Sequence, residues 1–400
     1  MARVTLPTAD WRGRAGLDRL TQTLGEGAAR FVGGVVRDTL LGLSVSDIDI
    51  ATRHAPDAVT AMLKQAGIRV VPTGIAHGTV TAVLDSGPVE ITTLRRDVST
   101  DGRRATVAYT DDWREDAARR DFTINALYAD PANGAVFDYF GGLDDLAARR
   151  VRFIGDPLQR IAEDHLRILR FFRFLARFGD VPDPAGLDAC TARAKDLMAL
   201  SRERIADELL KLLVARDAPR IVALMVDRGI FAPVLPEIGA DGAARLAHVA
   251  AREAVAGIAP DAIRRLGALL PQDPAVAESV GVRLKLSNVQ RKRLGAIAGP
   301  IPARGGVHAA YALGRETALD RLLLSDRTID AVTEVRDCPL PRFPLTGGAI
   351  VARGVRAGPD VARLLQAVEK QWVDEDFPDD ARADEIADAL VDQALRSQSS

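Results

Sequence analysis

The chain has 400 residues, of which 47% are hydrophobic and 27% charged, and its formal net charge at pH 7 is −2. This composition excludes collagen-like, low-complexity and generally disordered proteins, and the length favours two or more domains. No apolar run approaches the ~18 residues of a membrane-spanning helix, so we expect no membrane partner.

Two features favour a cytoplasmic protein. The N-terminal segment lacks the apolar core of a signal peptide. The two cysteines, Cys190 and Cys338, stand far apart and in no metal-ligand spacing, which fits a reducing compartment.

Residues 1–155 alternate short β-branched runs with helical patterns, which is typical of an α/β or α+β unit. Short helices are predicted at 35–43 and 56–66, the second with a proline in its first turn. The polar, glycine-containing stretch 97–112 is predicted to be a mobile loop. Strands are predicted at 29–32, 47–52, 136–139 and 151–154, and a hairpin joins 78–85 to 89–94.

Beyond Pro157 the pattern is almost wholly helical. Residues 158–178 are predicted as one long amphipathic helix, because apolar residues recur on one side at a helical period. Further helices are predicted at 203–214, 218–228, 261–269, 288–297, 361–373 and 384–396. We therefore predict an α+β protein with a small mixed-sheet head (1–155), an all-α neck (156–235), and an all-α body and acidic tail (236–400).

A glycine pair and two carboxylates form the first functional pattern. Gly33 and Gly34 lie between a strand and a helix, where the backbone can approach a ligand closely and the helix start offers N–H groups to a phosphate. Arg37 can add a charge-assisted bond to the same phosphate. Asp47 and Asp49 are two apart on a predicted strand and so share one face, where Mg²⁺ would bridge them to substrate phosphates. The glycine pair alone would indicate a plain turn, and the two carboxylates alone a solvated pair at a strand edge. Together they favour a phosphoryl-transfer site.

A second pattern covers residues 119–126, Arg-Arg-Asp-Phe-Thr-Ile-Asn-Ala. Arg119 and Arg120 can neutralise triphosphate charge, and Asn125 offers both a donor and an acceptor to a ribose hydroxyl. Asp121 is an alternative, internal anchor for an arginine. A capped, salt-bridged helix is the competing interpretation of this segment.

The third pattern lies in the predicted long helix, at Glu163-Asp164-His165-Leu166-Arg167. Asp164 and Arg167 are three apart and therefore neighbours on a helix. A carboxylate accepts from the exocyclic amine of cytosine or adenine, and a guanidinium donates to the adjacent ring acceptor. Uracil and guanine place a carbonyl oxygen against the carboxylate. The pair would thus select C and A without a nucleic-acid template, and a plain intrahelical ion pair is the alternative.

Taken together, the motifs resemble the class II tRNA nucleotidyltransferases and bacterial poly(A) polymerases of the DNA polymerase beta-like superfamily. Residues 33–38 with Asp47-Ile48-Asp49 are similar to the family's catalytic motif A, and 119–126 to motif B, which recognises ribose. Glu163, Asp164 and Arg167 match the amino-acid template of motif D, and 201–209 is similar to motif E, which braces the template helix. These signals cover residues 28–215, and the resemblance is loose beyond 240.

The resemblance implies a nucleotidyltransferase head followed by a neck that carries the base template. Asp47 and Asp49 would hold Mg²⁺. Glu90, on a predicted strand, is the candidate for a third carboxylate. The residues implied to bind the incoming nucleotide are Gly33, Gly34 and Arg37, then Arg119 or Arg120 with Asn125, then Asp164 and Arg167 with Arg170 and Arg173 in support.

The implied activity is addition of CCA to the 3′ end of tRNA from CTP and ATP. Poly(A) polymerases and CC- or A-adding specialists share these motifs and stay as alternatives. A further alternative is a catalytically inactive RNA-binding protein on the same fold, but such a protein should have lost a carboxylate, and both Asp47 and Asp49 are present. The sequence does not indicate an oligomeric state.

Overall fold

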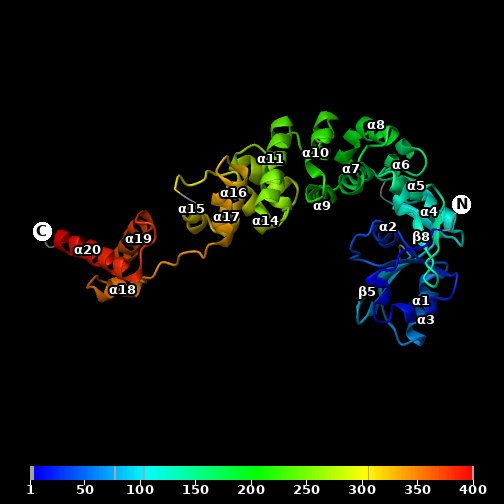
Figure 1. Ribbon diagram of the computed structural model, residues 1–400, viewed down its shortest axis with the longest axis horizontal. Helices are drawn as coiled ribbons and strands as arrows, with labels where there is room; N and C mark the ends of the chain where they lie inside the picture. The colour runs from blue at the N-terminus through cyan, green and yellow to red at the C-terminus, as the bar shows by residue number, and fades with distance from the viewer. Residues whose placement is uncertain (1–3, 76–77, 102–103, 305, 399–400) are drawn as a thin grey trace.

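The computed structural model describes residues 4–75, 78–101, 104–304 and 306–398. The chain forms an arch (Figure 1) in which a sheet-containing head stands at the N-terminal end and a row of helices curves away from it. The last three helices form a separate cluster at the C-terminal end. The predicted α+β class, with a mixed-sheet head and an elongated helical remainder, is confirmed.

A seven-stranded mixed sheet forms the head, in the order β3-β4-β5-β2-β1-β8-β9. Neighbouring strands are antiparallel except for β2 and β5, which run parallel. The predicted hairpin is confirmed as β4–β5. The strands are β1 (Ala29–Val32), β2 (Asp49–Thr52), β3 (Arg69–Gly74), β4 (Thr79–Leu84), β5 (Gly87–Thr93), β8 (Leu127–Ala129) and β9 (Val136–Asp138).

Strand alternation divides the residues of the sheet between two faces. On one face Phe31 and Ile50 join the main core, where helices α1 and α3 contribute Leu20 and Leu63. On the other face Val32 and Ala51 pack with Trp113 of α4 in a smaller core. Asp49 shares this second face, because it lies two residues before Ala51. The head helices are η1 (Asp10–Gly13), α1 (Leu17–Leu24), α2 (Gly34–Leu40), α3 (Pro56–Gln65), α4 (Trp113–Ala118), η3 (Thr123–Asn125) and α5 (Gly142–Ala147).

Two predictions for the head are wrong. The stretch 97–112 is not a loop, because β6 (Arg95–Asp101) and β7 (Arg104–Tyr109) pair as an antiparallel hairpin outside the main sheet. Residues 151–154 do not form a strand, since only an isolated bridge pairs Phe153 with Phe122.

The predicted helix 158–178 is also wrong as a single element. It is divided into α6 (Pro157–Glu163) and α7 (Arg167–Phe178), and between them Asp164 adopts an extended backbone with φ −151° and ψ 105°. The break changes where the template residues point. The remaining neck elements are α8 (Pro184–Ala192), η4 (Ala194–Ala199), α9 (Arg202–Leu213) and α10 (Ala218–Asp227).

The rest of the described chain is helical, and the helices predicted there are present. No helix among the described residues is long and apolar enough to cross a membrane. The elements are α11 (Ala240–Ala256), α12 (Ala262–Leu269), α13 (Pro274–Arg283), α14 (Asn288–Ile297), α15 (Gly306–Leu313), α16 (Arg315–Leu324), α17 (Ile329–Asp337), α18 (Gly347–Ala352), α19 (Pro359–Asp374) and α20 (Asp380–Gln398).

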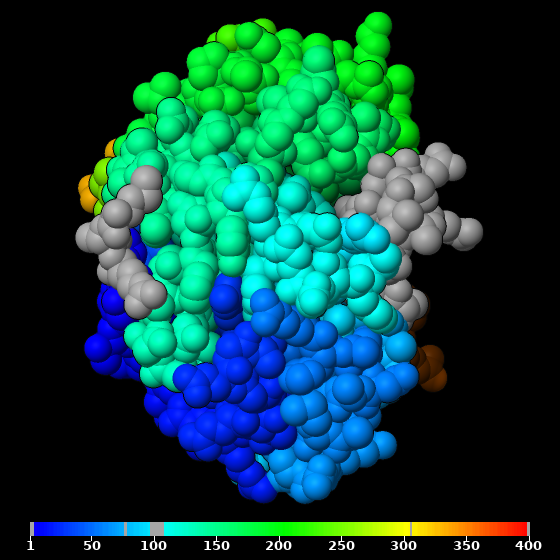
Figure 2. Space-filling model, turned by 90° about the vertical axis from the view of Figure 1, so that its right-hand side faces the viewer, coloured from blue at the N-terminus to red at the C-terminus, as the bar shows by residue number. Residues whose placement is uncertain are grey.

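The hydrophobic cores follow the arch. The largest one runs without interruption from Leu6 in the head to Ala298 in the body. Viewed from the head end, head and neck accordingly form one continuous surface (Figure 2). The last three helices have a core of their own, from Ile350 to Val391. Head and neck are therefore held rigidly enough to share a site.

Candidate active site

A tight turn joins β1 to α2 at the centre of the head. Gly33 has φ 73° and ψ −121°, a conformation that L side chains rarely adopt. Its N–H donates to the Leu127 carbonyl at 3.1 Å. A Cβ atom on Gly33 would stand 3.5 Å from Nη1 of Arg120, so the turn brings backbone close to that guanidinium.

A cavity of about 620 Å³ opens beside this turn, between the head and the neck. It brings together residues of all three sequence patterns, which are far apart in the chain. Arg119, Glu90 and Glu163 were also predicted but are not among its lining residues, whereas Phe174 lines it and was not predicted. The lining residues are Gly33, Gly34, Arg37, Asp47, Asp49, Arg120, Asp121, Asn125, Asp164, Arg167, Arg170, Arg173 and Phe174.

Asp47 and Asp49 both line the cavity, but only Asp49 belongs to a strand. The prediction that both lie on one strand is wrong, because β2 begins at Asp49 and Asp47 precedes it. Ile48 is fully buried in the main core, so the residues on either side of it are available to the cavity. Asp47 is exposed and accepts a 2.8 Å hydrogen bond from the Ser46 hydroxyl.

Asp49 is partly buried and has two other carboxylates near it. Parallel pairing of β2 with β5 places Glu90 directly opposite Asp49 in the register. Burial, then the charges of Glu90 and Asp47, raise the pKa of Asp49 to about 6, and Arg120 opposes them. A bound divalent cation would relieve this repulsion, so the residues present fit a metal site. Among described residues, however, no group of three or more His, Cys, Asp or Glu side chains is arranged to hold a metal ion.

A chain of hydrogen bonds crosses the floor of the cavity. Arg37 donates to Asn125 Oδ1 at 2.5 Å, and Asn125 Nδ2 donates to Asp121 at 2.9 Å. Asp121 also accepts two bonds from Arg170, at 2.8 and 2.6 Å. The structure therefore gives Asp121 the internal anchoring role that the sequence left as an alternative. Both ends of the Asn125 amide are engaged within the protein.

Asp116 organises the two arginines of the second pattern. It accepts bonds from Arg119 at 2.9 and 2.7 Å, from Arg120 at 3.2 Å and from the Tyr128 hydroxyl at 2.7 Å. Burial alone would raise the pKa of Asp116, but Arg120, Arg119 and Tyr128 together lower it to about 2. Arg120 is thereby held at the cavity, and Arg119 is turned to Asp116. The role of Asp116 could have been predicted from the sequence, because it stands three residues before Arg119 and four before Arg120, which are the spacings of ion pairs on a helix.

Asp164 and Arg167 do not form the intrahelical ion pair that was the alternative interpretation, because each has other partners. Asp164 accepts from Arg204 of α9 at 2.9 and 3.1 Å and from the backbone N–H of Leu166 at 3.1 Å. Arg167 donates instead to Glu163, at 2.5 Å, and to the Arg160 carbonyl, at 2.7 Å. The helix break separates the two side chains, yet both still line the cavity.

The neck arginines are fixed by buried carboxylates. Arg173 donates to Glu208 of α9 at 2.5 Å, and Nη1 of Arg170 lies 3.5 Å from the same carboxylate. Glu208 is buried. Arg204 and Glu208 both belong to the segment 201–209, which therefore contacts the template region through three ion pairs: Arg204 with Asp164, and Glu208 with Arg170 and Arg173.

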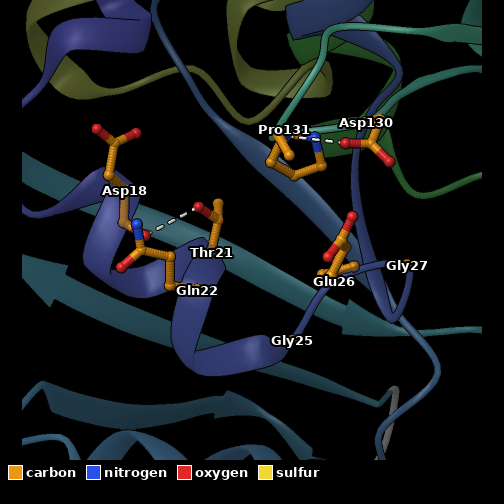
Figure 3. A pocket seen from close by; sticks show the side chains of 10 residues that line it. Asp18, Thr21, Gln22, Gly25, Glu26, Gly27, Asp130 and Pro131 are labelled. Atoms are coloured by element: carbon orange, nitrogen blue, oxygen red, sulfur yellow. Dashed lines mark hydrogen bonds between the residues drawn. The ribbon is translucent and has the colours of Figure 1, made fainter.

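Another pocket of the head, of about 510 Å³, carries acidic side chains and no basic ones (Figure 3). Asp18, Glu26 and Asp130 line it, and no cationic side chain does. Such a wall would repel a triphosphate. We therefore place the candidate active site at the cavity between head and neck.

Two family models match the chain. The poly A polymerase head domain matches residues 29–152, and the probable RNA and SrmB-binding site of polymerase A matches residues 182–241. The first match contains the glycine turn, both carboxylates and the 119–126 segment.

Whole-chain comparisons agree with these models. The chain is 37% identical to the human protein named CCA tRNA nucleotidyltransferase 1, mitochondrial, over 86% of this chain and 82% of the relative. It is 33% identical to the CCA-adding enzyme of Limosilactobacillus fermentum, over 94% and 96% of the two chains. The crystal structure of the Bacillus stearothermophilus CCA-adding enzyme in complex with CTP superposes with a TM-score of 0.77 at 27% identity, covering 98% of this chain and 99% of that one.

Proposed function

The chain belongs to the family of CCA-adding tRNA nucleotidyltransferases, and from this membership we propose that it adds C, C and A to the 3′ end of tRNA. The substrates are CTP and ATP, the product is tRNA extended without a nucleic-acid template, and pyrophosphate is released. The observation that carries the proposal is a single cavity that Asp47 and Asp49 line together with Asp164 and Arg167. Residues for the reaction and residues for base choice are thus within one nucleotide-sized space.

The carboxylates are proposed to hold the metal. Asp47 and Asp49 would bind Mg²⁺. Glu90, the candidate for a third carboxylate, lies opposite Asp49 in the register but does not line the cavity, so it would act through the charge of Asp49 and not as a direct ligand. Mg²⁺ takes oxygen ligands and usually completes its shell with waters and substrate phosphates, which suits a site with two lining carboxylates. When bound, such an ion stabilises the charge that develops on the phosphate oxygens.

Arginines and backbone are proposed to hold the triphosphate. Arg120 is fixed by Asp116 and faces the Gly33 turn, so a phosphate there meets a guanidinium that is already oriented. Asn125 keeps Arg37 and Asp121 in place through its two amide bonds. We therefore propose that Asn125 positions Arg37 and Asp121. To contact a ribose as well, Asn125 would have to give up one of these two bonds.

Base choice is proposed to rest on Asp164 and Arg167. Arg204 keeps the Asp164 carboxylate oriented, ready to accept from the amine of cytosine or adenine. Arg167 would donate to the neighbouring ring nitrogen. Because Arg167 is braced by Glu163, which does not line the cavity, Glu163 acts by positioning and not by contact with the base.

In the proposed reaction the 3′ hydroxyl oxygen of the RNA forms a bond with the α-phosphorus of the nucleotide. The bond from that phosphorus to the pyrophosphate oxygen breaks, and the hydroxyl proton is lost. The chain contributes mainly position and charge, as expected for this type of transfer.

Incubation with tRNA that lacks its 3′ end, CTP and ATP tests the proposal. We expect two cytidines followed by one adenosine. Products extended only by adenosines would favour a poly(A) polymerase or an A-adding specialist, and a stop after two cytidines would favour a CC-adding enzyme. An RNA that is bound but never extended would favour the inactive RNA-binding alternative.

We also propose the cytoplasm as the compartment of this chain. Cys190 and Cys338 are both free, as expected under reducing conditions. The human relative carries the word mitochondrial in its name, so imaging of a fluorescent fusion is the direct test, and a mitochondrial signal would contradict this proposal.

A further inference from the structure

A third cavity, of about 740 Å³, adjoins the candidate active site. Its walls come from the segment before Asp47, from the C-terminal end of α7 and from the C-terminal end of α9. Arg173 lines both this cavity and the one that holds Asp47 and Asp49. The lining residues are Leu41, Leu43, Ser44, Arg149, Arg173, Arg177, Phe178, Lys211, Val214, Ala215 and Arg216.

The charged lining of this cavity is entirely positive: five cations and no carboxylate contribute to it. Arg149 and Arg216 share one carboxylate, that of Asp180, at 3.6 and 3.2 Å. Both arginines, and Lys211, are about half exposed. Lys211 pairs with the exposed Asp207 at 2.7 Å. Exposed ion pairs contribute little stability, so a phosphate can replace Asp180 as the partner of the two arginines, and Asp207 as the partner of Lys211, at small cost.

The same cavity also presents apolar side chains to solvent. Leu43 is 44% exposed and Val214 is 41% exposed, whereas Phe178, which also lines the cavity, is buried. Cations combined with exposed apolar side chains suit an unpaired nucleotide, which offers a phosphate to the cations and a base and ribose to the apolar surface. The volume suits one nucleotide and is too small for a duplex.

We propose that this cavity binds the unpaired nucleotide that precedes the reacting 3′ end of the RNA. Its phosphate contacts Arg216, Arg149 and Lys211, and its base or ribose packs on Leu43 and Val214. The inference rests on the proposed function, and its geometric support is the shared Arg173 together with the short segment from Ser44 to Asp47. A free nucleoside triphosphate has the same chemistry and is the alternative that the test must separate.

The test compares a charge-reversed cavity with a matched control. Lys211→Glu with Arg216→Glu changes the cavity, and Lys64→Glu with Arg69→Glu makes the same change on α3 and β3, at the far end of the head from α9 (Figure 1). Lys211→Gln with Arg216→Gln removes the charges without reversing them and serves if the first variant folds poorly. Binding is measured with an RNA hairpin that ends in one unpaired 3′ nucleotide and with the same hairpin made blunt.

We expect the cavity variant to bind the overhanging hairpin about tenfold more weakly than wild type. The slope of log K against log salt concentration should fall by about 1.4, because each lost contact with a single strand contributes about 0.7. Affinity for the blunt hairpin and for CTP should match that of the control.

Equal losses on the blunt and overhanging hairpins would overturn the proposal, as would unchanged binding of both. A loss of CTP affinity would assign the cavity to a free nucleotide instead. These binding results are independent of catalysis. Failure of wild type to incorporate CMP and AMP would count against the proposed function and leave the binding comparison intact.

Discussion

At the residue scale, the two motif carboxylates differ in their surroundings. Asp47 is exposed to the cavity, whereas Asp49 is partly buried and stands beside Glu90. Both were identified from the Asp-Ile-Asp spacing, because alternation about a buried Ile48 is visible in sequence. The sequence did not show that Glu90 lies opposite Asp49, because this placement depends on which strand pairs with β2.

Asp47→Ala should reduce kcat at least about 10²-fold, the scale of losing one preorganised electrostatic group from an active site. Affinity for tRNA should change little, because this carboxylate repels phosphate. Single-turnover incorporation of CMP and equilibrium tRNA binding measure the two effects. Asp85→Ala, an exposed carboxylate in the turn between β4 and β5, is the control. Full activity of Asp47→Ala would show that the site is assigned wrongly.

Asp164→Ala should degrade base choice more than it slows the reaction. The variant loses the acceptor that distinguishes amines from carbonyls, so UMP and GMP incorporation should rise relative to CMP and AMP. Asp164→Asn adds an N–H donor and should favour uracil and guanine further. Competition between the four nucleotides gives the ratios. Unchanged preference for C and A in both variants would refute the template role.

Asp116 gives a prediction for stability and pH. The folded-state pKa, about 2, lies below the ordinary aspartate value, so the ionised form stabilises the fold above pH 4 and this contribution is lost as the pH falls towards 2. Asp116→Asn should therefore lower the free energy of unfolding by about 2 kcal/mol at pH 7. Urea unfolding at pH 7 and below pH 4 checks this, with Asp85→Asn as the control. A difference that does not shrink on acidification would contradict it.

At the element scale, periodicity identified the neck helix but could not locate its break. The apolar stripe continues through α6 and α7, so a hydrophobic pattern is the same for one helix or two. The break occurs where Asp164 accepts a bond from the N–H of Leu166, a local alternative to helical bonding that aspartate favours. This single turn is why Asp164 pairs with Arg204 and not with Arg167.

The β6–β7 hairpin was missed for a different reason. Charged and polar residues at 97–112 hide the alternation, although Asp101-Gly102 between two runs containing valine and threonine is a hairpin signal. A strand was predicted at the carboxylate motif, but it begins at Asp49 and not at Asp47, and the parallel pairing of β2 with β5 could not be predicted. This pairing joins residues 41 positions apart by a crossover (Asp49 pairs with Glu90, Thr52 with Thr93), and residue periodicity along the chain does not reveal it.

The turn between β1 and α2 also predicts a measurable effect. Gly33→Ala forces a side chain into a left-handed conformation and should lower the free energy of unfolding by about 1–3 kcal/mol. Gly34→Ala, at a residue without positive φ, should change it by less than about 1 kcal/mol. Urea midpoints compare the two variants. Equal effects would show that the Gly33 conformation is not maintained in solution.

At the scale of the whole molecule, the path of the arch was beyond prediction. Helix positions follow from local patterns, whereas the curvature depends on how each helix packs on the next. We propose functional boundaries near residues 155 and 235, and the main core crosses both. Head, neck and most of the body should therefore unfold together.

The separate C-terminal core predicts where the chain is cut first. Residues 338–346 have no helix or strand, and Arg342 among them is exposed. Trypsin should cleave there before it cleaves near 155 or 235, because local unfolding of a linker costs least. Mass spectrometry of the first fragments tests this. Initial cuts near 155 or 235 would contradict a head and neck that form one rigid unit.

The central claim is that one cavity both joins nucleotides to RNA and chooses them. The most direct test gives the wild-type protein a tRNA trimmed of its 3′ end together with all four nucleoside triphosphates and sequences the added nucleotides. We predict cytidine, cytidine, adenosine and then a stop, with uridine and guanosine excluded. A tail of adenosines, or addition of all four bases, would contradict it.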